Sequence, residues 1–374
     1  MRNLIALSLL SLAGAVATVW LIVPGRADTQ DMITGDQLGQ YVANRVVLAA
    51  SPSTPSSPQP QVGSPGAQRT DSVVIIQCDV NLDDAPDSYQ QQVERVLQGY
   101  QHATQAEHLL AYAMFSQTTQ TLNQMNRLVD FIARFPANTL ALRRLLTLCS
   151  SEISHPVCTD ELLDSVVESE AQNAAAWLAV ANYYAVKNHL PAAKNALYAL
   201  LTAPVLHEDY ASIVSLYVDA LAGSEAEQFR INALTGLAHA AANLASTADV
   251  TALCLDAASV DDEMLNLCLS VGENLENRAM LMKTKLFGNS LQGLIYGGLG
   301  DHDAAARVAA RASSILLSPD NQRFDQALLL ALHDQRLFRG WLNNIDEFGE
   351  QAAAQMLLDE AILLSQNPFY RPCL

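Results

Sequence analysis

Apolar residues recur every three or four positions along most of the chain, which is the period of an amphipathic helix. In the segment DSYQQQVERVLQGY, for example, Val93, Val96 and Tyr100 fall on one helical face. No segment after Cys78 shows the sustained two-residue alternation of a half-buried strand. The pattern therefore predicts an all-α body in which many helices are joined by short turns.

Short polar motifs and helix-breaking residues predict where these helices begin and end. Thr104 with Glu107, and Ser224 with Glu227, have the spacing of a capping box, in which two side chains bond the free N–H groups of a first turn. The second box predicts a long alanine-rich helix that reaches about Ala245. Helix-breaking residues predict interruptions at Pro136, Pro156, Pro191, Pro204, Gly223, Gly288, Gly300 and Pro319.

The N-terminus carries an uncharged apolar run from Leu4 to Val23, after the basic Arg2. At 1.5 Å per residue this run spans about 30 Å, the thickness of the hydrocarbon layer of a bilayer. A cleaved signal peptide has a shorter apolar run and a cleavage site between small residues, for which AVA at 15–17 is a candidate. We therefore expect residues 1–27 to be a transmembrane signal anchor or a cleaved signal peptide, and either alternative exports the rest of the chain.

The segment that follows is rich in proline and serine. Residues 51–68 read SPSTPSSPQPQVGSPGAQ, a composition that cannot bury enough apolar surface to offset the entropy lost on ordering. Prolines keep such a segment extended, at up to about 3.1 Å per residue. We expect residues 28–77 to be a flexible linker and residues 78–374 to be the folded helical body.

One window has the residue pattern of a known helical repeat. In AAAWLAVANYYAVKNHLPAAKNALYALLTAPV, residues 174–205, small alanines lie where two antiparallel helices would cross, and larger apolar residues lie on either side. This window resembles the tetratricopeptide repeat (TPR), a helix–turn–helix unit of about 34 residues. Leu200 departs from the pattern, because the family usually has alanine there. The residues that carry the resemblance in this unit, near 174–207, are Trp177, Val180, Ala181, Tyr184, Ala193 and Leu197.

A second unit, near 286–319, matches the same pattern less closely through Gly293, Tyr296 and Ala305. One such unit cannot bury its own apolar face, so the resemblance implies a TPR-like α-solenoid of stacked antiparallel helix pairs. The alternative is an irregular all-α domain that contains one lookalike hairpin. The resemblance also implies a concave groove that binds a segment of a partner protein, and its residues by carry-over are Asn182 and Lys187.

The chain is strongly acidic, with a formal net charge of −18 and a pI of about 4.7. Nucleic-acid-binding proteins present basic stripes, so this charge argues against a nucleic-acid partner. An acidic surface keeps a protein soluble, and it also attracts basic proteins. We therefore expect a protein partner, with basic partners favoured.

Aromatic residues make up only 6% of the chain, which favours packed helices over a β-sandwich.

The chain has six cysteines, and an even number in an exported protein favours disulfides. Six cysteines allow fifteen pairings, so their positions relative to the predicted helices must narrow the choice. A bond across a short helix–helix connection would stabilise the fold by about 3 kcal/mol. The expected pairs are Cys149–Cys158 and Cys254–Cys268, which flank two such connections, and Cys78–Cys373, which would join the two ends of the body.

The loop CSSEISHPVC, residues 149–158, has two other interpretations. Two cysteines, His155 and Glu152 could bind a metal ion, but the close CxxC spacing of structural zinc sites is absent. A catalytic cysteine needs a nearby base, and His155 is the local candidate. Export favours the disulfide over both alternatives, so we assign no metal, cofactor or catalytic residue.

No HExxH, GxSxG, Walker or GxGxxG motif occurs in the sequence. The polar triplet His207–Glu208–Asp209 is predicted to form the first turn of the helix that ends LYVDALAG. We expect a non-enzymatic protein–protein interaction scaffold or assembly factor of the bacterial cell envelope. It would lie in the periplasm and be anchored in the inner membrane, or be secreted if the leader is cleaved. The alternatives are a cell-wall-associated enzyme and a periplasmic ligand sensor, each with a helical superhelix.

Overall fold

The computed structural model describes residues 74–78, 88–116, 121–244, 247–258, 261–316 and 321–373. These residues form sixteen α-helices and one short 3-10 helix and contain no β-strand, which confirms the predicted all-α class. The predicted leader and nearly all of the predicted linker lie outside the described residues. Among the helices that are described, none has the length and apolar content needed to cross a membrane.

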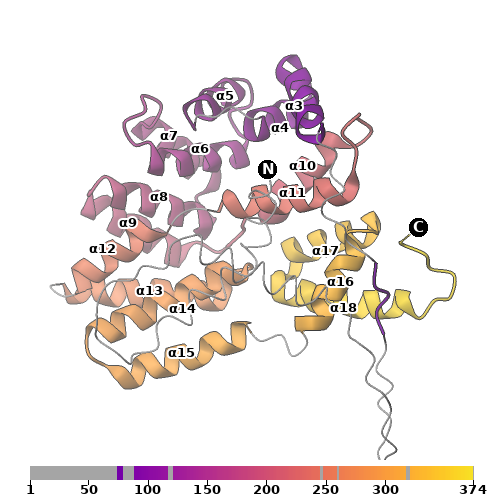
Figure 1. The fold of residues 1–374 in the computed structure, drawn as a ribbon. Coiled ribbons are helices and arrows are strands. Elements are labelled where there is room, and N and C mark those ends of the chain that lie inside the picture. The colour runs from indigo at the N-terminus through magenta and orange to yellow at the C-terminus, as the bar shows by residue number, and fades with distance from the viewer. Residues whose placement is uncertain are drawn as a thin grey trace, which may run out of the picture.

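The first half of the body is a row of helices in chain order. From α4 to α9, each helix packs against the next one (Figure 1). Few residues separate one helix from the next, so neighbouring apolar faces are buried against each other, as expected for helical hairpins. These elements are α3 (Tyr89–Gly99), η2 (Tyr100–His102), α4 (Ala106–Phe115), α5 (Thr121–Arg134), α6 (Thr139–Ser151), α7 (Asp160–Glu170), α8 (Ala174–Val186) and α9 (Leu190–Thr202).

The hairpin of α10 (Tyr210–Leu221) and α11 (Phe229–Ala242) leaves this row. After α9 the chain runs back, and α10 packs against α3 and α4. The row then resumes, because α12 contacts α8 and α13 contacts α9. The order of packing therefore differs from the order in the sequence at this hairpin. The helices that continue the row are α12 (Ala248–Ala258), α13 (Asp262–Arg278), α14 (Met282–Gly298) and α15 (His302–Leu316).

The last three helices form a small bundle beside the α10–α11 hairpin (Figure 1). They are α16 (Asn321–Ala331), α17 (Gln335–Phe348) and α18 (Glu350–Ser365). Phe338 and Trp341 of α17 are fully buried, and the ring of Phe338 meets Phe229 of α11 edge-on at 5.6 Å. Since α17 also packs against α10, the bundle is part of the same connected core as the row of helices.

Two glycines allow α13 and α14 to touch through their backbones. A Cβ atom at Gly288 would lie 2.4 Å from the carbonyl oxygen of Gly272 and 2.6 Å from the amide nitrogen of Glu276. The predicted helix break at Gly288 is therefore wrong: this glycine lies inside α14 and permits a close helix crossing. A glycine that serves packing and one that ends a helix look alike in a single sequence.

Both predicted capping boxes are also wrong. α4 begins at Ala106 without a side-chain cap. Ser224 and Glu227 instead close a turn before α11, in which a carboxylate oxygen of Glu227 accepts the N–H of Gly223 at 2.8 Å. Gly223 has a φ of 70°, so the chain reverses there before the helix begins.

The six cysteines form the three pairs expected from the sequence. One bond closes the α6–α7 connection and another joins α12 to α13. The third ties residues 74–78 to the C-terminal tail, and the N–H of Ile76 also donates to the hydroxyl of Ser365 at the end of α18 at 2.9 Å (Figure 1). Three disulfides are typical of proteins in oxidising compartments outside the cytoplasm. The pairs are Cys149–Cys158, Cys254–Cys268 and Cys78–Cys373.

Candidate functional site

The connection between α9 and α10 runs through the middle of the body. It lies against the turn between α7 and α8, where Val205 accepts the N–H of Ala174 at 2.8 Å and donates to the carbonyl of Gln172 at 3.0 Å. The predicted first turn at residues 207–209 is wrong, because α10 begins only at Tyr210. These three polar residues instead make tertiary contacts with distant helices, because the connection holds them between α6, α8 and α14.

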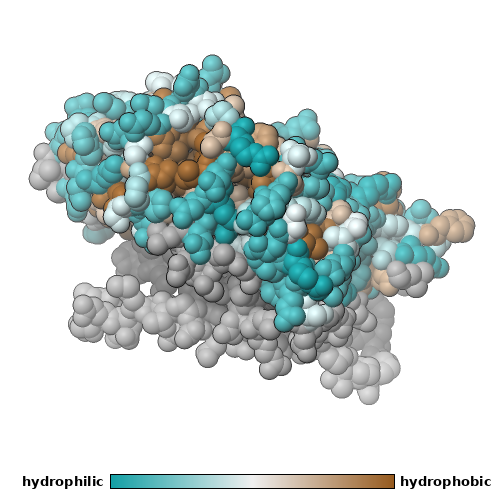
Figure 2. Space-filling model, turned by 90° about the horizontal axis from the view of Figure 1, so that it is seen from above, coloured by the Kyte–Doolittle hydropathy of each residue, from teal (hydrophilic) through white to brown (hydrophobic). Residues whose placement is uncertain are grey.

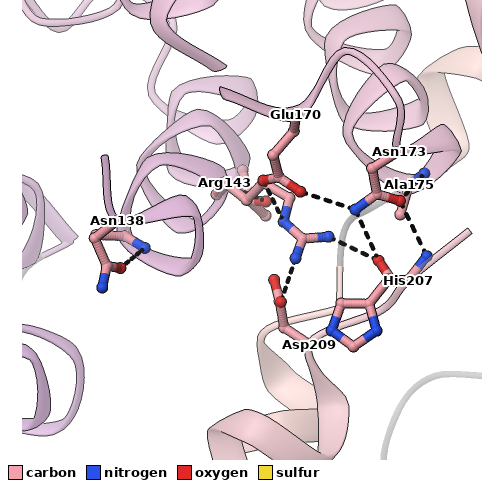
Figure 3. A network of polar contacts seen from close by, with 9 residues as sticks. Asn138, Arg143, Glu170, Asn173, Ala175, His207 and Asp209 are labelled. Atoms are coloured by element: carbon pink, nitrogen blue, oxygen red, sulfur yellow. Dashed lines mark hydrogen bonds and ion pairs between the residues drawn. The ribbon is translucent and has the colours of Figure 1, made fainter. Parts of the chain in front are cut away.

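Arg143 of α6 collects most of these contacts (Figure 3). Its guanidinium lies 2.9 Å from a carboxylate oxygen of Glu170, pairs with Asp209 and donates to the carbonyl of His207 at 2.9 Å. The side chains of Arg143 and Glu170 are 10% and 7% exposed. Burial raises the pKa of Glu170 and of Asp209, and the neighbouring charge of Arg143 opposes that rise. This ion network binds α6, α7 and the α9–α10 connection together.

Asn173 completes the network and caps α8 (Figure 3). Its carbonyl oxygen accepts the N–H of Ala175 at 3.1 Å and that of His207 at 3.0 Å. Its amide donates to Glu170 at 2.8 Å and to the carbonyl of His207 at 3.1 Å. All four hydrogen bonds that an asparagine amide can make are thus formed in a buried position.

Glu208 holds the start of α14 from the other side of the connection. Its carboxylate accepts the N–H groups of Met280 at 3.1 Å and Leu281 at 2.9 Å, which are otherwise unpaired at a helix start. Glu350 accepts the N–H of Met282 at 2.7 Å in the same way. Burial raises the pKa of Glu208, and burial together with the nearby Glu208 raises the pKa of Glu350 to about 7. Two carboxyl groups from distant parts of the chain therefore cap one helix.

A cavity of about 110 Å³ lies where α6, α8, α10 and α14 meet. Its lining combines apolar side chains with charged and polar groups, including Arg143, Glu208 and Asp209. This combination, apolar walls with a few polar groups, is typical of binding pockets. Its main apolar lining residues are Leu140, Leu178, Ile213, Leu244 and Phe287.

Several residues that line this cavity have a buried polar atom with no hydrogen-bond partner in the described part of the chain. These atoms are the hydroxyl of Tyr210, which is 7% exposed, the amide oxygen of Asn243 and the Nε of Arg144. Burial lowers the pKa of Arg144 to about 10, so this side chain is still charged at neutral pH. An unpaired buried polar group costs about 1–3 kcal/mol, which a bound molecule can recover by pairing with it. The cavity is therefore suited to binding a group that is partly apolar and both accepts and donates hydrogen bonds.

The carboxylates of Glu208 and Asp209 hold parts of the fold together. Asp209 is paired with Arg143, and Glu208 accepts backbone N–H groups. Within the described ranges, no three residues of the His, Cys, Asp and Glu types come together as a metal site would require. In the loop that closes with Cys149–Cys158, a ring nitrogen of His155 accepts the N–H of Val157 at 3.3 Å.

The first predicted repeat unit corresponds to the α8–α9 hairpin, whose two helices pack closely. Trp177 lies at its side and donates its indole N–H to the carbonyl of Ala171 at 2.8 Å. Tyr184 is likewise only half-buried. The other residues predicted for this core are buried, namely Val180, Ala181, Ala193 and Leu197.

The second predicted unit corresponds to the α14–α15 hairpin, with its turn at Gly300. Gly293 and Tyr296 lie on α14 and Ala305 lies on α15, and all three are half-buried. A Cβ atom at Gly293 would lie 3.6 Å from Val308 of α15, so the two helices approach each other at this point.

The two predicted groove residues lie apart from the cavity. Asn182 is only 2% exposed, because α6 and α12 both pack on α8, so it does not line an open groove as predicted. Lys187 is exposed at the end of α8, with its ammonium 4.4 Å from the ring centre of Tyr183. A site at the α9–α10 connection was not predicted from the sequence, because the polar residues there look like an ordinary helix start. Their role follows only from the ion pairs of Arg143 with Glu170 and Asp209.

The fold and the cavity define an all-α protein whose helices pack against their neighbours in a way that is compatible with a helical repeat fold. A comparison with models of protein families finds none that matches this chain, and comparisons with curated proteins and with solved structures find no match either. The function is therefore argued from the site itself.

Proposed function

We propose that this protein is a non-enzymatic binding scaffold or assembly factor of the bacterial cell envelope, built as a TPR-like α-solenoid. The observation that carries the proposal is the cavity between the helices, with its apolar wall and its unpartnered polar atoms. Helical hairpins that stack on each other present such surfaces to partner segments. The hairpin packing of α8–α9 and α14–α15 supports the TPR-like classification.

The apolar and the polar lining residues of the cavity make different contacts with the partner. An apolar side chain of the partner packs against Ile213 and Phe287. Arg144 and Tyr210 supply hydrogen-bond donors to an acceptor oxygen of the same segment. The net charge of −18 accelerates the approach of a partner with basic flanking residues and disfavours acidic ones.

The proposal places the folded body in the periplasm, anchored in the inner membrane or secreted. The apolar run at 4–23 anchors the chain in the inner membrane, or is removed on secretion, and the proline-rich segment holds the body away from the bilayer. The three disulfides support a place outside the cytoplasm. Figure 2 shows one face of the body, on which hydrophilic side chains surround an apolar area.

Photo-crosslinking in cells tests the proposal. A photo-reactive phenylalanine analogue at Phe287, which lines the cavity, should form a covalent adduct with one defined protein. The same analogue at Phe348, which is 49% exposed on α17 and outside the cavity, is the matched control and should not capture that protein. Adding Arg144→Gln to the protein that carries the analogue at position 287 should reduce the yield of the adduct. Equal capture at both positions, or no adduct at Phe287, would contradict a binding role for the cavity.

The size of the cavity also favours a second candidate, a sensor of small ligands. A volume of about 110 Å³ accommodates a group of a few heavy atoms, since one water molecule occupies about 30 Å³ in the liquid. A sensor would be stabilised against heat by a small metabolite, whereas a scaffold would be stabilised by its protein partner. Thermal-shift measurements with small carboxylic acids and with the crosslinked partner separate these two functions.

A further inference from the structure

A second cavity lies at the start of α17, and it shares no lining residue with the first one. It is open and has a volume of about 830 Å³, which falls in the range of pockets for small molecules. Three arginines and a histidine line it, among them Arg336 and Arg339 of α17, Arg371 of the C-terminal tail and His333 of the turn before α17. The chain has 39 acidic and only 21 basic residues, so this gathering of three arginines runs against the charge of the whole protein.

The C-terminal tail contributes its part of the cavity because it is held in place. The Cys78–Cys373 disulfide fixes the end of the tail, and the hydroxyl of Tyr370 donates to Asp334 at 2.7 Å. The other oxygen of the Asp334 carboxylate accepts the N–H of Arg336 at 2.9 Å and caps α17. The tail therefore brings Arg371 to the same cavity as Arg336 through contacts that are independent of any ligand.

Much of this positive charge is not neutralised. Arg336 and Arg371 are exposed and form no ion pair in the part of the chain that the structure describes. Arg339 pairs with Asp219 of α10, and Asp334 is the acidic residue of the lining. The Nε2 atom of His333 is buried without a hydrogen-bond partner among the described residues.

A glycine inside a helix is one of the lining residues of this cavity. Gly340 lies inside α17, where alanine would be more favourable for the helix. A Cβ atom there would meet no other atom within 4 Å, so a larger side chain would extend into free space. The glycine thus keeps room beside the arginines.

We propose that this cavity binds a phosphate group carried by a small molecule or by a lipid headgroup. Guanidinium groups match the oxygens of a phosphate with paired, charge-assisted hydrogen bonds, and two or three of them suit a doubly charged anion. In this proposal Arg336 and Arg371 pair with the phosphate, and Gly340 and Asn343, which also line the cavity, adjoin the rest of the ligand. The proposal concerns a separate site and does not depend on the function of the cavity at α6.

Calorimetric titration of the purified full-length protein with pyrophosphate tests the proposal. At low salt we expect saturable binding of one pyrophosphate per chain, weakened by added sodium chloride. The double variant Arg336→Gln/Arg371→Gln should raise the Kd at least tenfold. Gly340→Leu keeps every charge and places a larger side chain beside the arginines, and it should raise the Kd by a similar factor. Arg307→Gln, which removes an exposed arginine of α15 outside the cavity, is the matched control and should leave the Kd unchanged.

Further measurements distinguish the sources of the phosphate and the outcomes that would overturn the proposal. Citrate should bind at least tenfold more weakly than pyrophosphate, and equal binding would refute the phosphate class. Vesicles with phosphatidylglycerol should bind the wild type better than the double variant if a lipid headgroup is the ligand; pyrophosphate binding without this difference identifies a soluble ligand. No saturable pyrophosphate binding, or equal losses in Arg307→Gln and the double variant, would overturn the site.

Discussion

Replacing Arg143 with methionine is the sharpest test of the ion network. The substitution keeps an unbranched side chain of similar length but leaves Glu170 and Asp209 without their cation and the carbonyl of His207 without a donor. The side chains of Glu170 and Asp209 are only 7% and 16% exposed, so water replaces the lost contacts poorly. Breaking a buried ion pair by removing one partner costs about 3–5 kcal/mol.

The cost should depend on pH in a defined direction. Without Arg143, the pKa values of Glu170 and Asp209 rise further above their unfolded values, because the charge that opposes the effect of burial is then gone. A carboxyl group whose pKa is raised in the native state binds its proton more tightly when folded, so stability falls as pH rises from the unfolded pKa. We therefore expect a smaller loss at pH 5 than at pH 7.5.

Urea unfolding followed by circular dichroism at both pH values measures this effect. The matched control is Arg95→Met, because Arg95 and its partner Glu225 are 64% and 49% exposed, and such surface pairs contribute less than about 1 kcal/mol. Adding Glu170→Gln and Asp209→Asn to Arg143→Met should recover part of the loss, because no buried charge then remains unpaired. If Arg143→Met and Arg95→Met destabilise equally at pH 7.5, the network does not hold the helices as argued.

Three other predictions follow from single residues. Because burial raises the pKa of Glu350 to about 7, the free energy of unfolding of the wild type should fall by about 3 kcal/mol as the pH rises from 4.5 to 7. Glu350→Gln keeps an acceptor for the N–H of Met282 but removes the ionisable group, so this contribution to the fall should be absent from urea unfolding of the variant. Gly288→Ala should lower the free energy of unfolding by at least about 1–3 kcal/mol, whereas Gly293→Ala should be neutral or stabilising. Peptide mapping of the non-reduced protein should recover the Cys254–Cys268 linkage, and a different partner for Cys254 would contradict the fold.

Local sequence patterns predict the part of this fold that is set by neighbours in the chain. The α8–α9 hairpin and the disulfides across short connections follow from the spacing of apolar residues and cysteines. The packing of α10 against α3 and α4 cannot be predicted in this way, because the local sequence at residues 203–209 does not indicate which distant helices α10 will contact. Glu208 and Asp209 look like a polar helix start, and the partners that give them their role are 76 and 66 residues away, at Thr284 and Arg143.

The second site was missed for the same reason. Arg336 and Arg371 are separated by a whole helix in the sequence, and each alone has the appearance of an ordinary exposed arginine. They meet because the tail is tied back by its disulfide and by Tyr370. The predicted groove residue Asn182 fails in the opposite sense, since the approach of α12 covers a position that one repeat alone would expose.

The bond between Cys78 and Cys373 turns the folded body into a covalent ring. A protease that cuts one peptide bond anywhere inside this ring leaves the pieces in a single molecule until a reductant opens the sulfur bridge. Mechanical tension that arrives along the chain before residue 78 passes directly to the C-terminal tail through that bridge and does not peel the helices apart one after another. Since Cys373 is exposed, the redox state of the surroundings decides whether this protection persists.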